Sequence, residues 1–185
     1  MKAARVRPAA PVSARYVALL RAVNVGGHNL LAMSALKAML EGMGFTQVRT
    51  LLQSGNVVFD GAALPGEELE RRLALETGQR LGVDIDFFVR SAPQWIDLVE
   101  CNPMMEQARS APSQLLVMCL QHEPDLPQRL ALEAAPPADE QVRVVGRQAY
   151  VWYPQGAGKS RLKLPVLATG RNWNTVLKLA DLLRQ

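Results

Sequence analysis

Short apolar runs alternate with helix-like segments along this chain, and their order restricts the fold more than any other feature of the sequence. In the first half, the pattern predicts a strand at 16–21, a helix at 33–44, strands at 48–53 and 56–61, a helix at 65–82 and a strand at 83–90. This βαββαβ order is that of a ferredoxin-like unit. Ser34 is the expected N-cap of the first helix, and Gly44 is its expected C′ residue.

The second half repeats much of this order. A helix is expected after Ser91, and the remaining elements are a strand at 113–121, a helix at 124–134, a hairpin of 142–146 and 148–153, and a helix at 172–183. The resulting βαββα order lacks only the final strand of a second unit. We therefore expect an α+β fold of two ferredoxin-like units packed together, with antiparallel sheets and helices on one face. The expected divisions are a mobile basic leader (1–15), a first unit (16–91) and a second unit (92–185).

The sequence pI of 9.4 suggests a nucleic-acid partner until the charges are located. Residues 1–15 carry four basic and no acidic residues, residues 16–155 carry 11 basic and 16 acidic, and residues 156–185 carry six basic and one acidic. This distribution favours a local anion site near the C-terminus over a broad duplex-binding face. The chain has no apolar run long enough to span a membrane. Cys101 and Cys119 are expected to be buried free thiols, which favours a cytoplasmic location.

The stretch WYPQGAGKS, residues 152–160, ends like a nucleotide-phosphate loop. That motif needs a glycine five residues before Gly158, and Tyr153 occupies the position. Pro165 also leaves little room for the helix whose N-terminus binds the phosphate. We conclude that this is no Walker motif, although Lys159 and Ser160 remain candidates for a flexible anion-binding turn.

The loop after the first strand and the start of the last helix hold the other candidate ligand-binding residues. Glycine permits close approach of a ligand to the backbone, and asparagine offers both donors and acceptors, although both types also serve purely structural loops. The hairpin residues Gln53, Ser54 and Asn56 are better explained by the turn, which is expected at the opposite end of the sheet from the first loop. Trp173 is expected in the core, and Asn172 or Asn174 is the expected N-cap of the last helix. The candidate ligand residues are Arg21, Asn24, Gly26, Gly27, Asn29, Lys159, Ser160, Arg171, Asn172 and Asn174.

Catalytic chemistry has little support in the sequence. His28 and His122 are the only histidines, and neither has a cysteine or carboxylate partner at metal-ligand spacing. Whether the protein is an enzyme, which cofactor it uses and its oligomeric state all stay open.

Four stretches together resemble one bacterial family, catalogued as domain of unknown function 1697. They are RAVNVGGHN (21–29), LLQSGNVVF (51–59), YPQGAGKSRL (153–162) and TGRNWNTVLKL (169–179). The resemblance runs from about residue 16 to the C-terminus and implies two packed ferredoxin-like units. It implies no activity. Our preferred hypothesis is binding of a small phosphate- or carboxylate-bearing ligand. The alternatives are a nucleic-acid-binding protein and a protein-interaction subunit without catalysis.

Overall fold

The computed structural model describes residues 13–24, 30–134, 136–137 and 139–185. The first half contains β1 (Ser13–Leu20), α1 (Met33–Gly42), β2 (Thr46–Thr50), β3 (Asn56–Ala62), α2 (Gly66–Leu81), β4 (Phe87–Ser91) and α3 (Ala92–Glu100). The second half contains α4 (Met105–Ser110), β5 (Leu115–Leu120), α5 (Leu126–Ala134), β6 (Gln141–Val145), β7 (Gln148–Trp152), the 3-10 helix η1 (Ala157–Lys159), β8 (Ala168–Asn172) and α6 (Trp173–Leu183).

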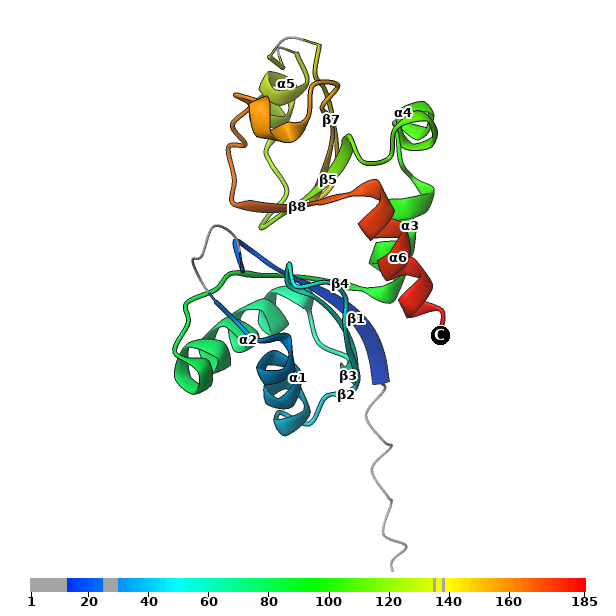
Figure 1. The fold of residues 1–185 in the computed structure, drawn as a ribbon. Helices are drawn as coiled ribbons and strands as arrows, with labels where there is room; N and C mark the ends of the chain where they lie inside the picture. Colours follow the sequence, from blue (N-terminus) through cyan, green and yellow to red (C-terminus); the bar gives the residue numbers. More distant parts are fainter. Residues whose placement is uncertain (1–12, 25–29, 135, 138) are drawn as a thin grey trace, which may run out of the picture.

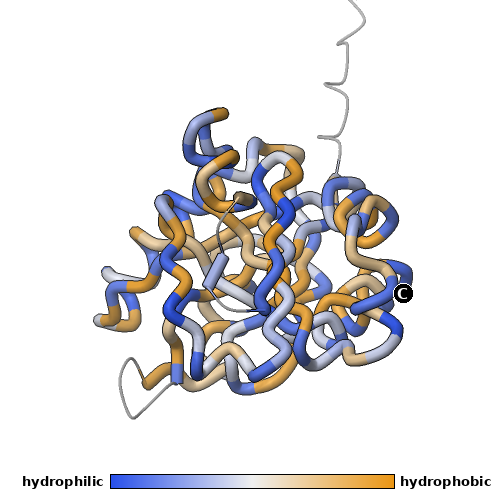
Figure 2. The backbone as a smooth tube through the Cα atoms, turned by 90° about the horizontal axis from the view of Figure 1, so that it is seen from above, coloured by the Kyte–Doolittle hydropathy of each residue, from blue (hydrophilic) through white to orange (hydrophobic). Residues whose placement is uncertain are grey.

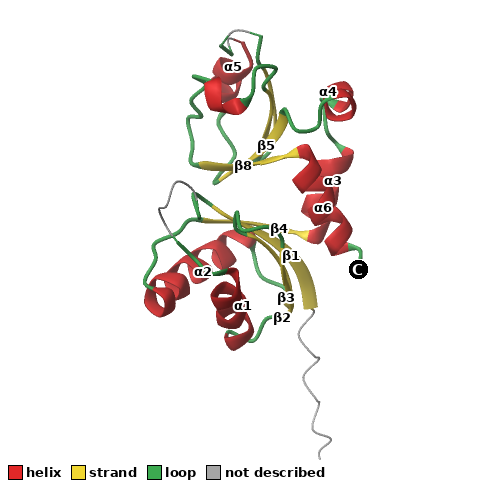
Figure 3. Ribbon diagram, in the orientation of Figure 1, coloured by secondary structure: helices red, strands yellow, loops and turns green. Residues whose placement is uncertain are grey.

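The strands form two four-stranded antiparallel sheets, ordered β2-β3-β1-β4 and β6-β7-β5-β8. Figure 1 shows the sheets one above the other, with α1 and α2 below the lower sheet and α5 above the upper sheet. Helices α3 and α6 lie together at one side of the two sheets (Figure 3). The predicted α+β fold with two ferredoxin-like units is confirmed.

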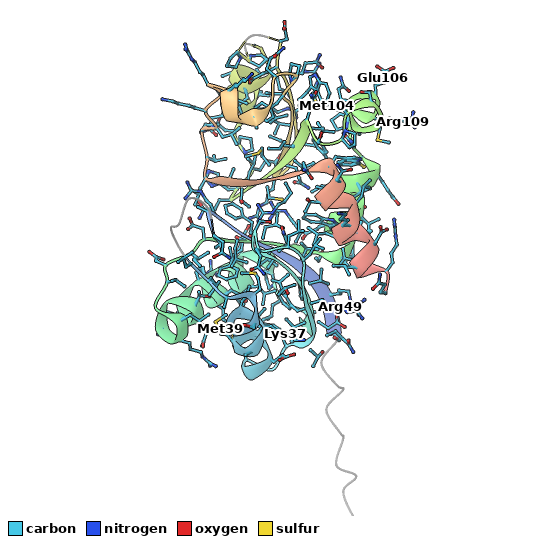
Figure 4. All side chains as sticks on the ribbon, in the orientation of Figure 1. Lys37, Met39, Arg49, Met104, Glu106 and Arg109 are labelled. Carbon is cyan, nitrogen blue, oxygen red and sulfur yellow. The ribbon has the colours of Figure 1, made fainter. Side chains whose placement is uncertain are left out.

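Side chains that alternate along each central strand divide the core into three clusters. On β1, Ala18 and Leu20 pack against the α1 and α2 layer, whereas Val17 and Leu19 enter a central cluster with α3, α6 and the second sheet. A third cluster lies under α5. Figure 4 shows Met39 in the α1 layer and Met104 beside α4, next to the central cluster. Hydrophobic and hydrophilic residues are interspersed along the chain (Figure 2), as expected when each element has one buried face.

The two units share their strand register. Val17 of β1 lies opposite Arg90 of β4, and Val117 of β5 lies opposite Arg171 of β8. The amide of Leu20 donates to the Gly55 carbonyl at 2.8 Å, and the amide of Leu120 donates to the Arg147 carbonyl at 2.9 Å. The repeat that the sequence pattern indicated is therefore present in the hydrogen bonding.

The expectation that the second unit lacks its final strand was wrong. Ala168–Asn172 forms β8, which pairs with β5 along five residues. The missing element is instead the helix between the third and fourth strands, where the chain has only η1 and an extended segment. The sequence ATGRN has weak strand propensity, so β8 depends on the pairing site that β5 offers.

Some helix ends follow the local rules for capping residues, and others do not. Gly44 and Gly82 have φ of +90° and +68° after α1 and α2, as expected of C-terminal glycines. The predicted N-cap Ser34 is wrong, because α1 begins at Met33 after Ala32, which makes no side-chain cap bond.

The boundary of the leader and the burial of one cysteine also differ from the predictions. Strand β1 begins at Ser13, three residues before the expected start, and Arg15 pairs with Asp60 at 2.6 Å. Residues 1–12 of the predicted leader lie outside the described residues. Cys119 is buried as expected, whereas Cys101 is exposed.

Candidate functional site

Arg171 lies at the junction of the two units, where it contacts the end of β1 and the β2–β3 turn. Its Nη2 donates to the carbonyls of Leu20, Ser54 and Gly55 at 2.9, 3.0 and 3.0 Å, and its Nε donates to Asn56. Its Nη1 donates to Thr169 and to the Gly170 carbonyl. An arginine presents five N–H groups in a planar fork, so this arrangement ties β8 of the second unit to the end of β1 and the β2–β3 turn of the first.

The partners of Arg171 are all neutral oxygen atoms. Burial lowers the pKa of Arg171 to about 10, because the charged form loses water without gaining a carboxylate. All three guanidinium nitrogens already donate to protein atoms, so an anion would have to displace existing hydrogen bonds. The role of Arg171 as a ligand residue stays a prediction; its contacts describe a clamp between units.

Arg90 makes the reciprocal contact from the first unit to the second. Its side chain is 2% exposed, and its Nη2 donates to the carbonyls of Leu120 and Arg147 at 2.9 and 3.0 Å. Leu120 ends β5 as Leu20 ends β1, and Arg147 lies in the β6–β7 turn. Each fourth strand thus provides one arginine that holds the end of the first strand and the hairpin turn of the other unit.

Glu70 of α2 balances the charge beside Arg90. It lies 3.5 Å from Arg90, accepts from the amide of Val89 at 2.8 Å and contacts Arg147 at 3.3 Å. Burial raises the pKa of Glu70, while the Val89 amide and the two arginines act in the opposite direction. From the sequence, Glu70 is only an acidic residue near the start of the helix expected at 65–82, where it suits the helix dipole, and Arg90 has no assigned role. Nothing in the local pattern indicated that either side chain is buried.

The loop after β1 lies beside the β2–β3 turn. Asn24 donates to the Gln53 carbonyl at 2.8 Å and exchanges two hydrogen bonds with Leu31. The expectation that the first loop and this turn lie at opposite ends of the sheet was wrong, because the antiparallel pairing of β1 with β3 places both at one end. Arg21 is exposed, 3.4 Å from Asp86. The candidates Gly26, Gly27 and Asn29 lie outside the described residues.

Lys159 and Ser160 belong to a different region from Arg171. Lys159 is exposed in η1, a single 3-10 turn, so an α-helix N-terminus for a phosphate is not formed there. Ser160 donates to Glu140 at 2.9 Å and accepts from the amide of Leu162 at 3.0 Å. Ser160 thus anchors the extended segment that follows.

This extended segment forms one wall of a groove of about 510 Å³. We call this groove the α5 groove. Residues 161–165 form one of its walls, and Ala131 and Leu132 of α5 form the opposite wall. The segment RLKLP alternates in character, so Leu162 and Leu164 pack toward the third core cluster while Arg161 and Lys163 are exposed. Within the part of the chain that the structure describes, neither cation forms an ion pair.

Asn172 and Asn174 occupy distinct positions at the start of α6. Asn172 is the N-cap, and its Oδ1 accepts from the amide and the hydroxyl of Thr175, both at 3.0 Å. Asn174 is exposed in the first turn, and Trp173 is buried as expected. The structure therefore distributes the predicted residues over three places: the Arg171 junction, the first loop beside it, and the segment leading to the α5 groove.

The sequence interpretation missed Arg161 and Lys163 as individual residues. It counted them in the basic C-terminal region, and their alternation with leucine was the signal that separates them from the buried arginines. Among the described residues, no group of three or more His, Cys, Asp or Glu side chains is placed to hold a metal ion. No helix in the same residues is long and apolar enough to cross a membrane.

Comparison with known proteins gives a family and a fold. A conserved bacterial protein from Streptococcus pneumoniae has a similar solved structure, with a TM-score of 0.76 and 20% sequence identity over 93% of this chain and 99% of that chain. No curated protein matches the chain. Residues 14–150 match the family described as "Protein of unknown function (DUF1697)". That match covers well over half of the sequence, so the chain belongs to this family of unknown function.

Proposed function

We propose that this protein binds a small anionic ligand, bearing a phosphate or a carboxylate, in the α5 groove. The observation that carries the proposal is the placement of Arg161 and Lys163 on the groove wall without an ion pair among the described residues. Arg129, by contrast, has the carboxylate of Glu133 nearby. Exposed cations such as Arg109 and Lys178 also form no ion pair among the described residues, but they do not line the groove. What distinguishes Arg161 and Lys163 is that both lie on the wall of one groove. Two unpaired cations next to a concave surface attract an anion more strongly than either does alone.

The same site supports a small ligand better than a nucleic acid. Ferredoxin-like domains that bind RNA stack bases on aromatic residues of an open sheet face. Here the sheet residues Tyr16, Phe59, Phe88 and Tyr150 are at most 2% exposed. Both sheets are covered on both faces by helices, by the extended segment or by the other unit.

Pairing of a partner strand with the β4 edge or the β6 edge also has little support. On β4, the amide of Val89 donates to Glu70, and on β6 the amide of Val144 donates to Glu133 at 2.7 Å. Arg143 donates to the carbonyl of Val142 on the same edge. Side chains that occupy edge groups in this way discourage strand addition. The groove is therefore the more favourable place for a ligand.

The test is isothermal titration calorimetry of the full chain with butyl phosphate and with butanoate at constant ionic strength. The double variant Arg161→Gln/Lys163→Gln should bind at least about tenfold more weakly, because each charged hydrogen bond contributes about 1.5 kcal/mol or more. The matched control is Arg109→Gln/Lys178→Gln, which removes the same charge from exposed sites outside the groove. Figure 4 shows Arg109 on α4, at the side of the molecule.

Equal losses in the two double variants would show that only net charge matters, and would refute the groove as the site. Absence of binding by both anions to the unaltered protein would refute the proposed function. A selective loss in the groove variant supports it.

A further inference from the structure

The α5 groove occupies a position that a helix fills in the first unit. There α1 and α2 lie side by side over the sheet, and Thr77 of α2 contacts Met39 of α1 at 3.7 Å. In the second unit, α5 corresponds to α1, and the extended segment 161–165 stands where α2 would be. An extended chain is narrower than a helix of about 10 Å diameter. The groove is thus the space left between α5 and the substitute for a second helix.

Apart from its two cations, the lining of this space is mostly apolar. Ala131 and Leu132 face it from α5, and Leu162, Leu164 and Pro165 face it from the segment. A phosphate alone would use only the rim and leave this apolar surface in water. Burial of apolar surface is the main favourable contribution to binding in such pockets.

We propose that the ligand of the α5 groove is an amphiphilic anion, in which a phosphate or carboxylate head is joined to an aliphatic or aromatic body. The head pairs with Arg161 and Lys163, and the body lies against Leu132 and Leu164. This inference rests on the proposed function and specifies the ligand class for that site. The volume of about 510 Å³ lies within the range of small-molecule pockets, which suits a body of roughly six to ten carbon atoms.

The test is a series of n-alkyl phosphates from methyl to octyl, titrated into the full chain below their micellar concentrations. Affinity should rise about fourfold for each added methylene until the groove is filled, and then level off. Ala131→Glu places a long charged side chain on the groove wall and should flatten this dependence. Ala134→Glu is the matched control, since Ala134 is exposed on the same helix but does not line the groove.

The outcomes separate this inference from the function on which it rests. If methyl and octyl phosphate bind equally well, and Arg161→Gln/Lys163→Gln still weakens both, anion binding stands and the amphiphilic ligand is refuted. If no member of the series binds, both proposals fail. If the chain-length dependence persists unchanged in Ala131→Glu, the alkyl chain lies elsewhere and the inference is overturned. A dependence lost in Ala131→Glu and kept in Ala134→Glu supports it.

Discussion

Each unit holds the other through one buried arginine with the same geometry, but the positive charges of the two arginines are compensated differently. Arg90 and Arg171 occupy equivalent register positions and hold equivalent carbonyls of the opposite unit. Arg90 has the carboxylate of Glu70 beside it, 3.5 Å away. Arg171 has only carbonyl, hydroxyl and amide oxygens, and burial lowers its pKa to about 10.

The difference follows from one element. Glu70 belongs to α2, and the second unit has no helix at the corresponding place. Without that helix there is no carboxylate to face Arg171, and there is also an open groove beside α5. The clamp therefore depends on the strands and turns, whereas the surrounding layer determines its charge balance and the available binding space.

The largest expected effect is the loss of the balanced clamp. Arg90→Met leaves Glu70 buried beside one arginine and removes the guanidinium hydrogen bonds to the Leu120 and Arg147 carbonyls, so unfolding free energy should fall by about 3 to 5 kcal/mol. Arg171→Met leaves no buried carboxylate, and its cost should be about 2 to 3 kcal/mol from the lost hydrogen bonds to the carbonyls of the first unit. Urea denaturation of the full chain at pH 7 measures both.

Arg109→Met is the control for a lost surface charge and should change stability by no more than about 0.5 kcal/mol. A cost for Arg171→Met equal to or above that for Arg90→Met would contradict the role assigned to Glu70.

A smaller effect should separate the two hairpin turns. Gly55 has φ of +72°, and a Cβ there would lie 2.7 Å from the Cβ of Leu20. Gly146 has φ of +55°, and a Cβ there would be 3.9 Å from its nearest neighbour. Gly55→Ala should therefore cost about 2 to 4 kcal/mol, from backbone strain and overpacking together. Gly146→Ala should cost about 1 to 2 kcal/mol from strain alone. Thermal denaturation compares the two; equal costs would show that the close approach at Gly55 is relieved by a shift of the strand.

Much of the fold was predictable because local rules and apolar periodicity determine it. The glycines after α1 and α2 and the capping residue Ser91 mark helix ends that the structure retains. Strand β8 was not predictable from propensity, since Gly170, Arg171 and Asn172 are poor strand formers and the pairing partner lies about 50 residues away. To place the first loop relative to the hairpin turn, the antiparallel pairing of β1 with β3 must be known. The sequence interpretation put the two at opposite ends of the sheet, whereas they lie at the same end.

The candidate site was less predictable than the fold. The sequence alone does not distinguish an arginine that is buried against carbonyls, such as Arg171, from one that is exposed on a groove, such as Arg161. Only long-range packing separates the two. The concentration of positive charge near the C-terminus was visible, but the residues with free donors could be chosen only after β8 and the extended segment were located.

The smallest expected effect concerns the helices that follow the two clamps. Asn172 caps α6 by accepting a hydrogen bond from the Thr175 amide at 3.0 Å, whereas Ser91 accepts one from the Gln94 amide at 3.5 Å. A shorter cap bond should contribute more, so Asn172→Ala should cost about 1 kcal/mol and Ser91→Ala about 0.5 kcal/mol. Asn174 is exposed two residues after the N-cap, so Asn174→Ala should not lower the free energy of unfolding measured in urea. Because alanine has a higher helix propensity than asparagine, Asn174→Ala has no reason to lower stability. If it costs as much as Asn172→Ala, the loss at Asn172 does not come from capping, and the assigned difference between the two caps is contradicted.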